Sequence, residues 1–162
     1  MLDLNLDSGL YLWSNIPVFD DTYKLDEKGY DDLTDFVLER FKDFNFSLCG
    51  NSSRFLQSIN LNNDLEYCCF SVYKNCFRIS RIEIPKDKRG SGFLKAFLVE
   101  LYEFLPSIGI NCILFENILN KDLLDYLKKN GYEEIYLNIF KSDYYESDMC
   151  DVYKIIGGNF DG

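Results

Sequence analysis

The sequence contains no histidine. A Ser-His-Asp or Cys-His catalytic arrangement, a zinc site with histidine ligands and a histidine-based switch near neutral pH are therefore excluded together. The chain also lacks an apolar run close to the roughly 18 residues that a membrane-spanning helix needs. Its acidic start, Met1-Leu2-Asp3, lacks the basic and then apolar pattern of a secretion signal. We therefore expect a soluble, cytoplasmic protein that does not enter the membrane.

The six cysteines contain no C-x-x-C pair, which argues against a cysteine-based metal or redox motif; they are Cys49, Cys68, Cys69, Cys76, Cys112 and Cys150. Three of them lie in strand-like apolar runs, where a free cysteine behaves as a small hydrophobe. We interpret the cysteines as reduced core residues rather than disulfide partners, and we expect no metal site.

No linker, internal repeat or low-complexity tract divides the 162 residues, and 47% of them are hydrophobic. This predicts one domain, residues 1–162, with a substantial core. Apolar periodicity predicts helices over residues 31–44, 51–59, 93–105 and 120–130. The helix over residues 93–105 carries few charges, so we expect it to be covered on most of its circumference. Strands are predicted over residues 65–73, 76–84, 112–115, 134–140 and 151–156. The first two strands are expected to pair as an antiparallel hairpin around Lys74-Asn75. The fold class is therefore α/β, with a mixed, mostly antiparallel central sheet flanked by helices.

The net charge of −10 is unfavourable for nucleic-acid binding, and we expect none. Residues 76–95 differ from the rest of the chain, because they hold six basic and only two acidic residues together with Gly90 and Gly92. Glycines let successive backbone N–H groups and a helix N-terminus converge on one anion. The segment therefore predicts a site for a phosphate-like group, and a solvated basic loop is the alternative.

The loop fits neither the P-loop pattern nor G-x-G-x-x-G. Between a strand and an apolar helix it reads Arg89-Gly90-Ser91-Gly92-Phe93-Leu94. This resembles the acyl-CoA loop of the GCN5-related N-acetyltransferase (GNAT) superfamily, [Q/R]-x-x-G-x-[G/A], except that Leu94 stands where the family prefers glycine or alanine. A second block, in which an asparagine, a helix and a G-[FY] pair follow the next strand, is matched by Asn120 and Gly131-Tyr132. The two blocks lie within residues 76–156, and the first sixty residues are not clearly matched.

The resemblance implies a GNAT-like fold and acetyl-CoA as co-substrate. It places the CoA pyrophosphate on backbone amides of the glycine loop, which comprises Arg89, Gly90, Ser91, Gly92 and Phe93. It pairs the pantetheine arm with the strand edge at Ile82 and Ile84 and brings Asn120 against the same arm.

Acetyl transfer to an amine needs a group that receives the amine proton, and in a chain without histidine this base is a carboxylate or solvent. Glu83 and Glu116 are the candidates, with an ion pair to Arg81 and a contact at a strand end as their respective structural alternatives. The family places the acid for the leaving thiolate four residues before the G-[FY] glycine, where this chain has Leu127. Tyr126 is one position earlier, which is about 100° of rotation on a helix.

Two functions remain open. The first is an acetyl-CoA-dependent N-acetyltransferase whose acidic surface attracts a cationic acceptor, either a basic protein (through a lysine or its amino terminus) or a small polyamine or aminoglycoside. The second is an acidic interaction protein on the same fold, such as a nucleic-acid mimic or an inhibitor of a basic partner. A homodimer is compatible with either function.

Overall fold

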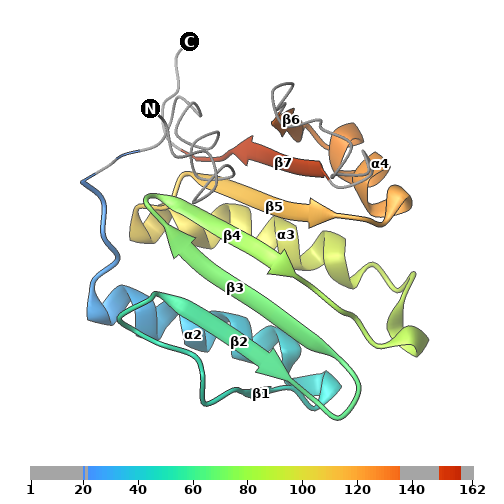
Figure 1. Ribbon diagram of the computed structural model, residues 1–162, viewed down its shortest axis with the longest axis horizontal. Coiled ribbons are helices and arrows are strands. Elements are labelled where there is room, and N and C mark those ends of the chain that lie inside the picture. The colour runs from blue at the N-terminus through green and yellow to red at the C-terminus, as the bar shows by residue number, and fades with distance from the viewer. Residues whose placement is uncertain (1–19, 21, 136–149, 158–162) are drawn as a thin grey trace, which may run out of the picture.

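The computed structural model describes residues 20, 22–135 and 150–157. Its seven-stranded sheet has the order β1-β2-β3-β4-β5-β7-β6 (Figure 1). The strands are β1 (Ser47–Leu48), β2 (Ser58–Asn62), β3 (Tyr67–Tyr73), β4 (Cys76–Arg81), β5 (Cys112–Ile118), β6 (Glu133–Ile135) and β7 (Cys150–Ile155). All neighbours are antiparallel except β4 and β5, which are parallel. The predicted fold class, a mixed and mostly antiparallel sheet flanked by helices, is confirmed.

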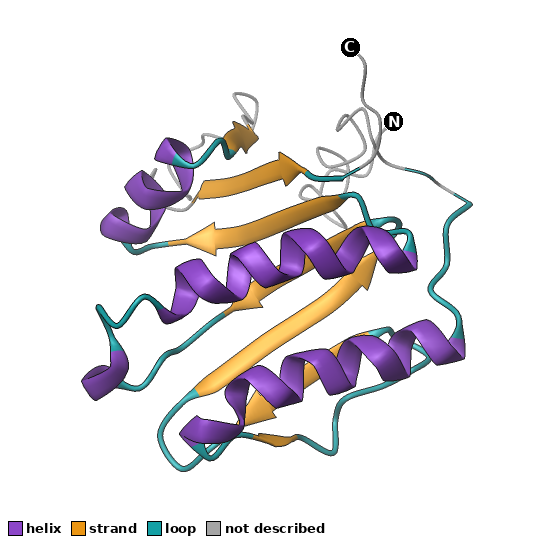
Figure 2. Ribbon diagram, turned by 180° about the vertical axis from the view of Figure 1, so that it is seen from behind, coloured by secondary structure: helices purple, strands orange, loops and turns teal. Residues whose placement is uncertain are grey.

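In the described ranges three α-helices accompany the sheet: α2 (Glu27–Phe41), α3 (Phe93–Phe104) and α4 (Lys121–Lys129). Short 3₁₀ turns follow α2 (η1, Lys42–Phe44), precede α3 (η2, Lys86–Lys88) and follow α3 (η3, Leu105–Ile108). Figures 1 and 2 together show α2 and α3 side by side on one face of the sheet, while α4 lies near the end of β5. No helix among the described ranges is long and apolar enough to cross a membrane.

An aromatic cluster joins α2 and α3 to the sheet. Phe41 of α2 is fully buried, with its ring centroid 5.3 Å from that of Phe97 on α3 and 5.9 Å from that of Phe70 on β3. Phe70 in turn stacks on Phe77 of β4. Because side chains alternate along a strand, the residues next to these point to the opposite face of the sheet, which carries polar groups.

The hairpin predicted around Lys74-Asn75 is confirmed: β3 and β4 pair across it, and Lys74 has the positive φ (52°) typical of a tight hairpin turn. The strand predicted to reach residue 84 ends at Arg81. Cys68, Cys76 and Cys112 are fully buried free thiols, as predicted, and Cys49 and Cys69 are partly buried.

Two predictions about helices are wrong. Residues 51–59 form no helix but a turn that leads into β2, and Phe55 and Leu56 are 84% and 67% exposed. The second concerns α3, whose few charges predict burial on most of its circumference. Val99 of α3 is 47% exposed, because the sheet and its neighbours cover only the face that carries Phe97, Leu98 and Leu101.

Candidate active site

The parallel strands β4 and β5 separate before either of them ends. Their pairing runs from Cys76 with Cys112 to Ile79 with Phe115. Beyond this point β4 continues beside β3, whereas β5 continues beside β7 (Figure 1). We call the resulting opening, between residues 80–84 and residues 116–118, the fork. It leaves one edge of each segment without a strand partner among the residues that the structure describes.

Both strands are irregular where the fork opens. On β4, Ile79 pairs with Phe70 and Arg81 with Cys69, so that Ser80 is an extra residue without a partner on β3. On β5 the register with β7 also shifts between Phe115 and Ile118. Such bulges redirect side chains and are frequent beside active sites.

Residues 82–84 continue from β4 along one side of the fork. Glu83 hydrogen-bonds Tyr67, and its backbone N–H contacts the Cys68 sulfur, so this segment stays beside the start of β3. The opposite edge, at Ile82 and Ile84, therefore faces the fork. The pantetheine pairing that the resemblance implies has room at this edge, although the carbonyl of Ile84 already accepts a hydrogen bond from Arg89 Nε (3.1 Å).

The glycine loop leads into the N-terminus of α3, which crosses behind β4 and β5 in Figure 1. Gly90 (φ 79°) and Gly92 (φ 85°) both have left-handed backbones, which L-residues with a side chain rarely adopt. A Cβ built at either glycine would meet no atom within 4 Å. The loop is therefore open to a ligand on these glycines.

The first amides of α3 have no side-chain cap, whereas Asp26 caps α2 and Asn120 caps α4. The first N–H groups of a helix lack partners within the helix, and the positive end of its dipole favours an anion. The Ser91 hydroxyl already donates a hydrogen bond to the carbonyl of Lys88 (2.6 Å). Ser91 therefore offers a ligand its backbone N–H rather than its side chain.

Glu116 lies on β5 at the fork with 18% of its side chain exposed. Its neighbour Phe115 belongs to the core on the helix side, so Glu116 points to the opposite face of the sheet, where Arg78 also lies. The Ser80 hydroxyl donates to Glu116 Oε1, and Arg78 Nε lies 4.0 Å from the same oxygen. The Arg78 Nε also donates to the Ser71 hydroxyl at 2.8 Å. The structure therefore brings four polar groups together at this point.

Glu83 has different contacts. It accepts hydrogen bonds from the Tyr67 backbone N–H (2.7 Å) and from Arg81 Nη2 (3.0 Å). Partial burial raises the pKa of Glu83, but the hydrogen bonds from Arg81 and Tyr67 outweigh burial and lower the pKa below its ordinary value. A carboxylate held in its charged form by two donors is a weak proton acceptor, so the surroundings favour the ion-pair interpretation of Glu83.

Asn120 and Tyr126 belong to α4. The Asn120 carbonyl oxygen accepts the N–H of Leu123 (3.1 Å) as the helix cap, which leaves its amide nitrogen for other partners. Tyr126 is partly buried against the core. Leu127, at the position where the resemblance expects the thiolate acid, is fully buried. Tyr126 and Leu127 therefore point in different directions from α4.

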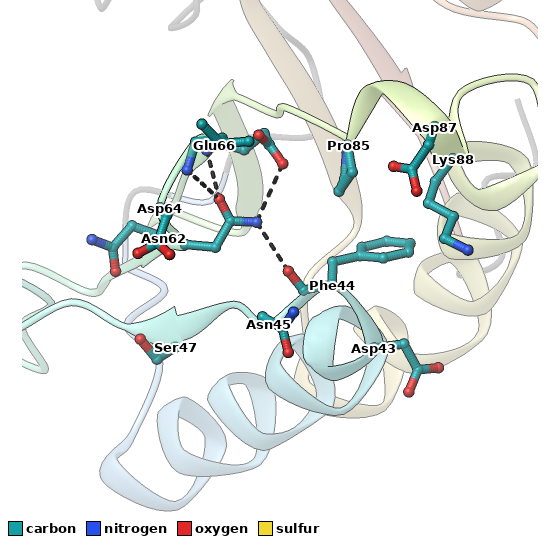
Figure 3. A pocket seen from close by; sticks show the side chains of 12 residues that line it. Asp43, Phe44, Asn45, Ser47, Asn62, Asp64, Glu66, Pro85, Asp87 and Lys88 are labelled. Atoms are coloured by element: carbon teal, nitrogen blue, oxygen red, sulfur yellow. Dashed lines mark hydrogen bonds between the residues drawn. The ribbon is translucent and has the colours of Figure 1, made fainter.

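A cavity of about 480 Å³ opens next to the glycine loop (Figure 3). Pro85, Asp87 and Lys88 line one side of it, and η1 and the turn between β2 and β3 line the rest. Its carboxylates are Asp43, Asp64, Glu66 and Asp87, against the single cation of Lys88. Asn63 fixes this wall by donating to the carbonyl of Phe44 (2.9 Å) and accepting from the Glu66 N–H (2.6 Å).

Sequence reasoning missed Arg78 and Ser80. They lie on β4, far in the chain from Glu116 on β5. The signal that could have found them is the parallel register, since the residue after Ile79 must lie beside the residue after Phe115.

No protein-family model and no curated protein matches the chain. Solved structures similar to it include the ribosomal-protein-S18-alanine N-acetyltransferase of Escherichia coli, with 15% identity, coverage of 85% of this chain and 96% of that chain, and a TM-score of 0.48. An acetyltransferase of the GNAT family from Staphylococcus aureus has 13% identity, coverage of 83% and 98%, and a TM-score of 0.46. An acetyltransferase from Bacillus subtilis in complex with CoA has 14% identity, coverage of 68% and 97%, and a TM-score of 0.44.

All three of these similar structures are acetyltransferases, and one of them is described as a member of the GNAT family.

Proposed function

We propose that the chain is an acetyl-CoA-dependent N-acetyltransferase. The observation that carries this proposal is the uncapped N-terminus of α3, which follows two left-handed glycines and lies directly after the strand that forms one side of the fork. Amides at such a position bind phosphate groups. Arg89 and the neighbouring Lys86 and Lys88 add positive charge around them.

Acetyl-CoA would lie with its pyrophosphate on the amides of residues 89–93 and its pantetheine arm along Ile82 and Ile84. The open space at Gly90 and Gly92 fits such an approach, since no described atom fills it. The amide nitrogen of Asn120, which the cap does not use, is available to the same arm. Acetyl-CoA supplies the thioester that is attacked.

Glu116 is the proposed base. One proton leaves the ammonium form of the acceptor for this carboxylate, and the neutral amine then attacks the thioester carbon. As the C–N bond forms and the C–S bond breaks, the second proton released from nitrogen neutralises the departing thiolate. Tyr126 is the tyrosine nearest to the position that the resemblance gives to the donor of that proton. Its partial burial against the core supports packing more than it supports this role, so we assign the delivery to solvent.

The acceptor that we propose is a cationic amine, either a lysine or amino terminus of a basic protein or a small polyamine or aminoglycoside. Two features support this class: the net charge of −10 and the carboxylate-lined cavity beside the glycine loop. A field of one sign raises the local concentration of ligands of the opposite sign.

The test is a calorimetric titration of acetyl-CoA into the wild type and into Gly92→Val. We expect the wild type to bind and the variant to lose at least about tenfold in affinity, because the new side chain enters space that the phosphates need. Gly131→Val is the matched control, since Gly131 also has a left-handed backbone (φ 90°) but lies after α4. It should carry the same backbone strain and bind normally.

Circular dichroism of both variants checks that the fold is retained. A wild type that binds no acetyl-CoA refutes the proposed function. A folded Gly92→Val with wild-type affinity refutes the assignment of the phosphates to this loop.

A further inference from the structure

Two side chains at the fork contact Glu116, and both contact the same oxygen. Ser80 donates its hydroxyl hydrogen to Oε1, and the Arg78 guanidinium lies 4.0 Å from Oε1. No described residue forms a hydrogen bond or ion pair with Oε2. Among the described residues, every fully buried side-chain oxygen has a hydrogen-bond partner. Since Oε2 has none among them, this oxygen is at least partly exposed, in agreement with the 18% exposure of the Glu116 side chain.

The backbone of β4 is irregular at Ser80. This residue is the extra residue of the bulge on β4, so no register with β3 fixes its direction. Ile79 faces the core, so alternation along the strand puts Ser80 on the opposite face, together with Arg78 and Glu116. The Ser80 hydroxyl donates across the parallel pair to Glu116, at the first position after the two strands cease to pair.

Arg78 is itself held in place. Its Nε donates to Ser71 on β3, and 28% of its side chain is exposed. A partly buried guanidinium attracts a carboxylate at this distance and holds it on that side. The contacts with Ser71 and Glu116 together restrict the rotation of the long, flexible Arg78 side chain before any ligand binds.

We infer that Ser80 and Arg78 are positioning residues that hold Glu116 by Oε1, so that Oε2 is the oxygen that takes the proton of the acceptor amine. This inference rests on the proposed function. Neither residue touches the acceptor; each acts through the orientation of the carboxylate. Pre-orientation of a base removes part of the entropic cost of reaching the reactive geometry.

A purely structural interpretation assigns the same contacts to closing the end of the β4–β5 pair. The two interpretations differ in what Ser80 does when Glu116 can no longer act as a base. A positioning residue then has nothing to position, so its loss costs no further activity. A structural residue costs as much as before.

The experiment is a double-mutant cycle on acetyl transfer. Thiol release from acetyl-CoA is followed with spermidine, a lysine-rich peptide and a neutral peptide amino terminus as acceptors, for the wild type, Ser80→Ala, Glu116→Gln and the double variant. We expect Glu116→Gln to lower kcat about 100-fold and Ser80→Ala about tenfold. The double variant should be no slower than Glu116→Gln alone. The KM for acetyl-CoA should stay within about twofold of wild type, because the phosphate contacts are elsewhere.

Ser80→Thr, which keeps the hydroxyl, should restore most of the rate. Ser107→Ala is the matched control, because Ser107 on η3 also donates its hydroxyl to an oxygen, that of Phe104, and lies outside the fork. Arg78→Met should follow Ser80→Ala in losing kcat, and it too should cost nothing further when Glu116 is already Gln.

A tenfold loss from Ser80→Ala that persists in the Glu116→Gln background overturns the inference, as does a Ser80→Ala variant with wild-type kcat. Both leave the proposed function standing, because the wild type transfers acetyl groups. A wild type that binds no acetyl-CoA, or acetylates none of the three acceptors, overturns the proposed function and this inference with it.

Discussion

Glu83 and Glu116 have the same side chain in different surroundings. Glu83 accepts two good hydrogen bonds and pairs with Arg81, whereas Glu116 is held through one oxygen and keeps the other open. Each oxygen of Glu83 has its own donor, which stabilises the fold at that point, whereas the second oxygen of Glu116 has no described donor and can accept a proton. At the scale of the residue, contacts therefore separate two candidates that the sequence could not rank by composition.

The lowered pKa of Glu83 makes a prediction about stability. A carboxyl group whose pKa is lower in the folded than in the unfolded protein stabilises the fold above the unfolded pKa, near 4.5. That stabilisation is lost as pH falls through the lower, folded pKa. Glu83→Gln should therefore unfold more easily than wild type at pH 7, and the difference should shrink progressively below about pH 4.5.

Urea unfolding at a series of pH values measures this difference. Glu103→Gln is the control, because Glu103 is exposed on α3 without the paired donors of Glu83. A difference between wild type and Glu83→Gln that stays constant down to pH 2 would contradict the assignment.

Among the elements, those with strong local signals were predictable. Helix α2 follows from apolar residues at three- and four-residue steps, and the β3–β4 hairpin follows from β-branched and aromatic runs around a two-residue turn. The helix prediction for residues 51–59 is wrong because contacts with other parts of the chain decide the structure of this segment. Arg54 forms ion pairs with Glu27 and Asp31 of α2, and Ser53 bridges Ser58, which fixes a turn where the local pattern resembles a helix.

The candidate site divides in the same way. The glycine loop and the cap at Asn120 are local motifs, so the sequence shows them directly. The fork depends on where two strands cease to pair, and the positions of Ser80 and Arg78 depend on the register between them. Neither is encoded in a short stretch of sequence, because parallel pairing joins residues that are distant in the chain.

The attachment of α2 to the sheet makes a prediction at the element scale. Phe41 is fully buried and contacts aromatic rings from α3 and β3. Phe41→Ala should lower the free energy of unfolding by about 3–5 kcal/mol, because it leaves a cavity between the helix layer and the sheet. Phe55→Ala, at a residue 84% exposed, should change it by no more than about 0.5 kcal/mol. Urea unfolding of both variants measures the contrast, and equal losses would contradict the packing described.

At the scale of the molecule, the acidic side chains differ in how far they are paired with basic ones. On and around α2, acids are paired with bases: Asp32 with Lys28, Glu39 with Lys42, and Asp31 with Arg54. Such pairing interrupts any continuous row of negative charge along this face, which gives little support to a nucleic-acid mimic. The carboxylates of the cavity beside the glycine loop face one lysine, so the excess negative charge there is available to a ligand.

This distribution makes a prediction about the acceptor. If the negative field attracts a cationic amine to the fork, the KM for spermidine should rise several-fold between about 50 mM and about 500 mM KCl, because salt screens the attraction. Triglycine is the control acceptor, since its ammonium is balanced by its own carboxylate and its KM should change much less. Both values come from initial rates at saturating acetyl-CoA, at each salt concentration. Acetyl-CoA binding also weakens with salt, and saturation removes that contribution from the comparison. Equal salt dependence for the two acceptors would show that the net charge of −10 does not select the acceptor.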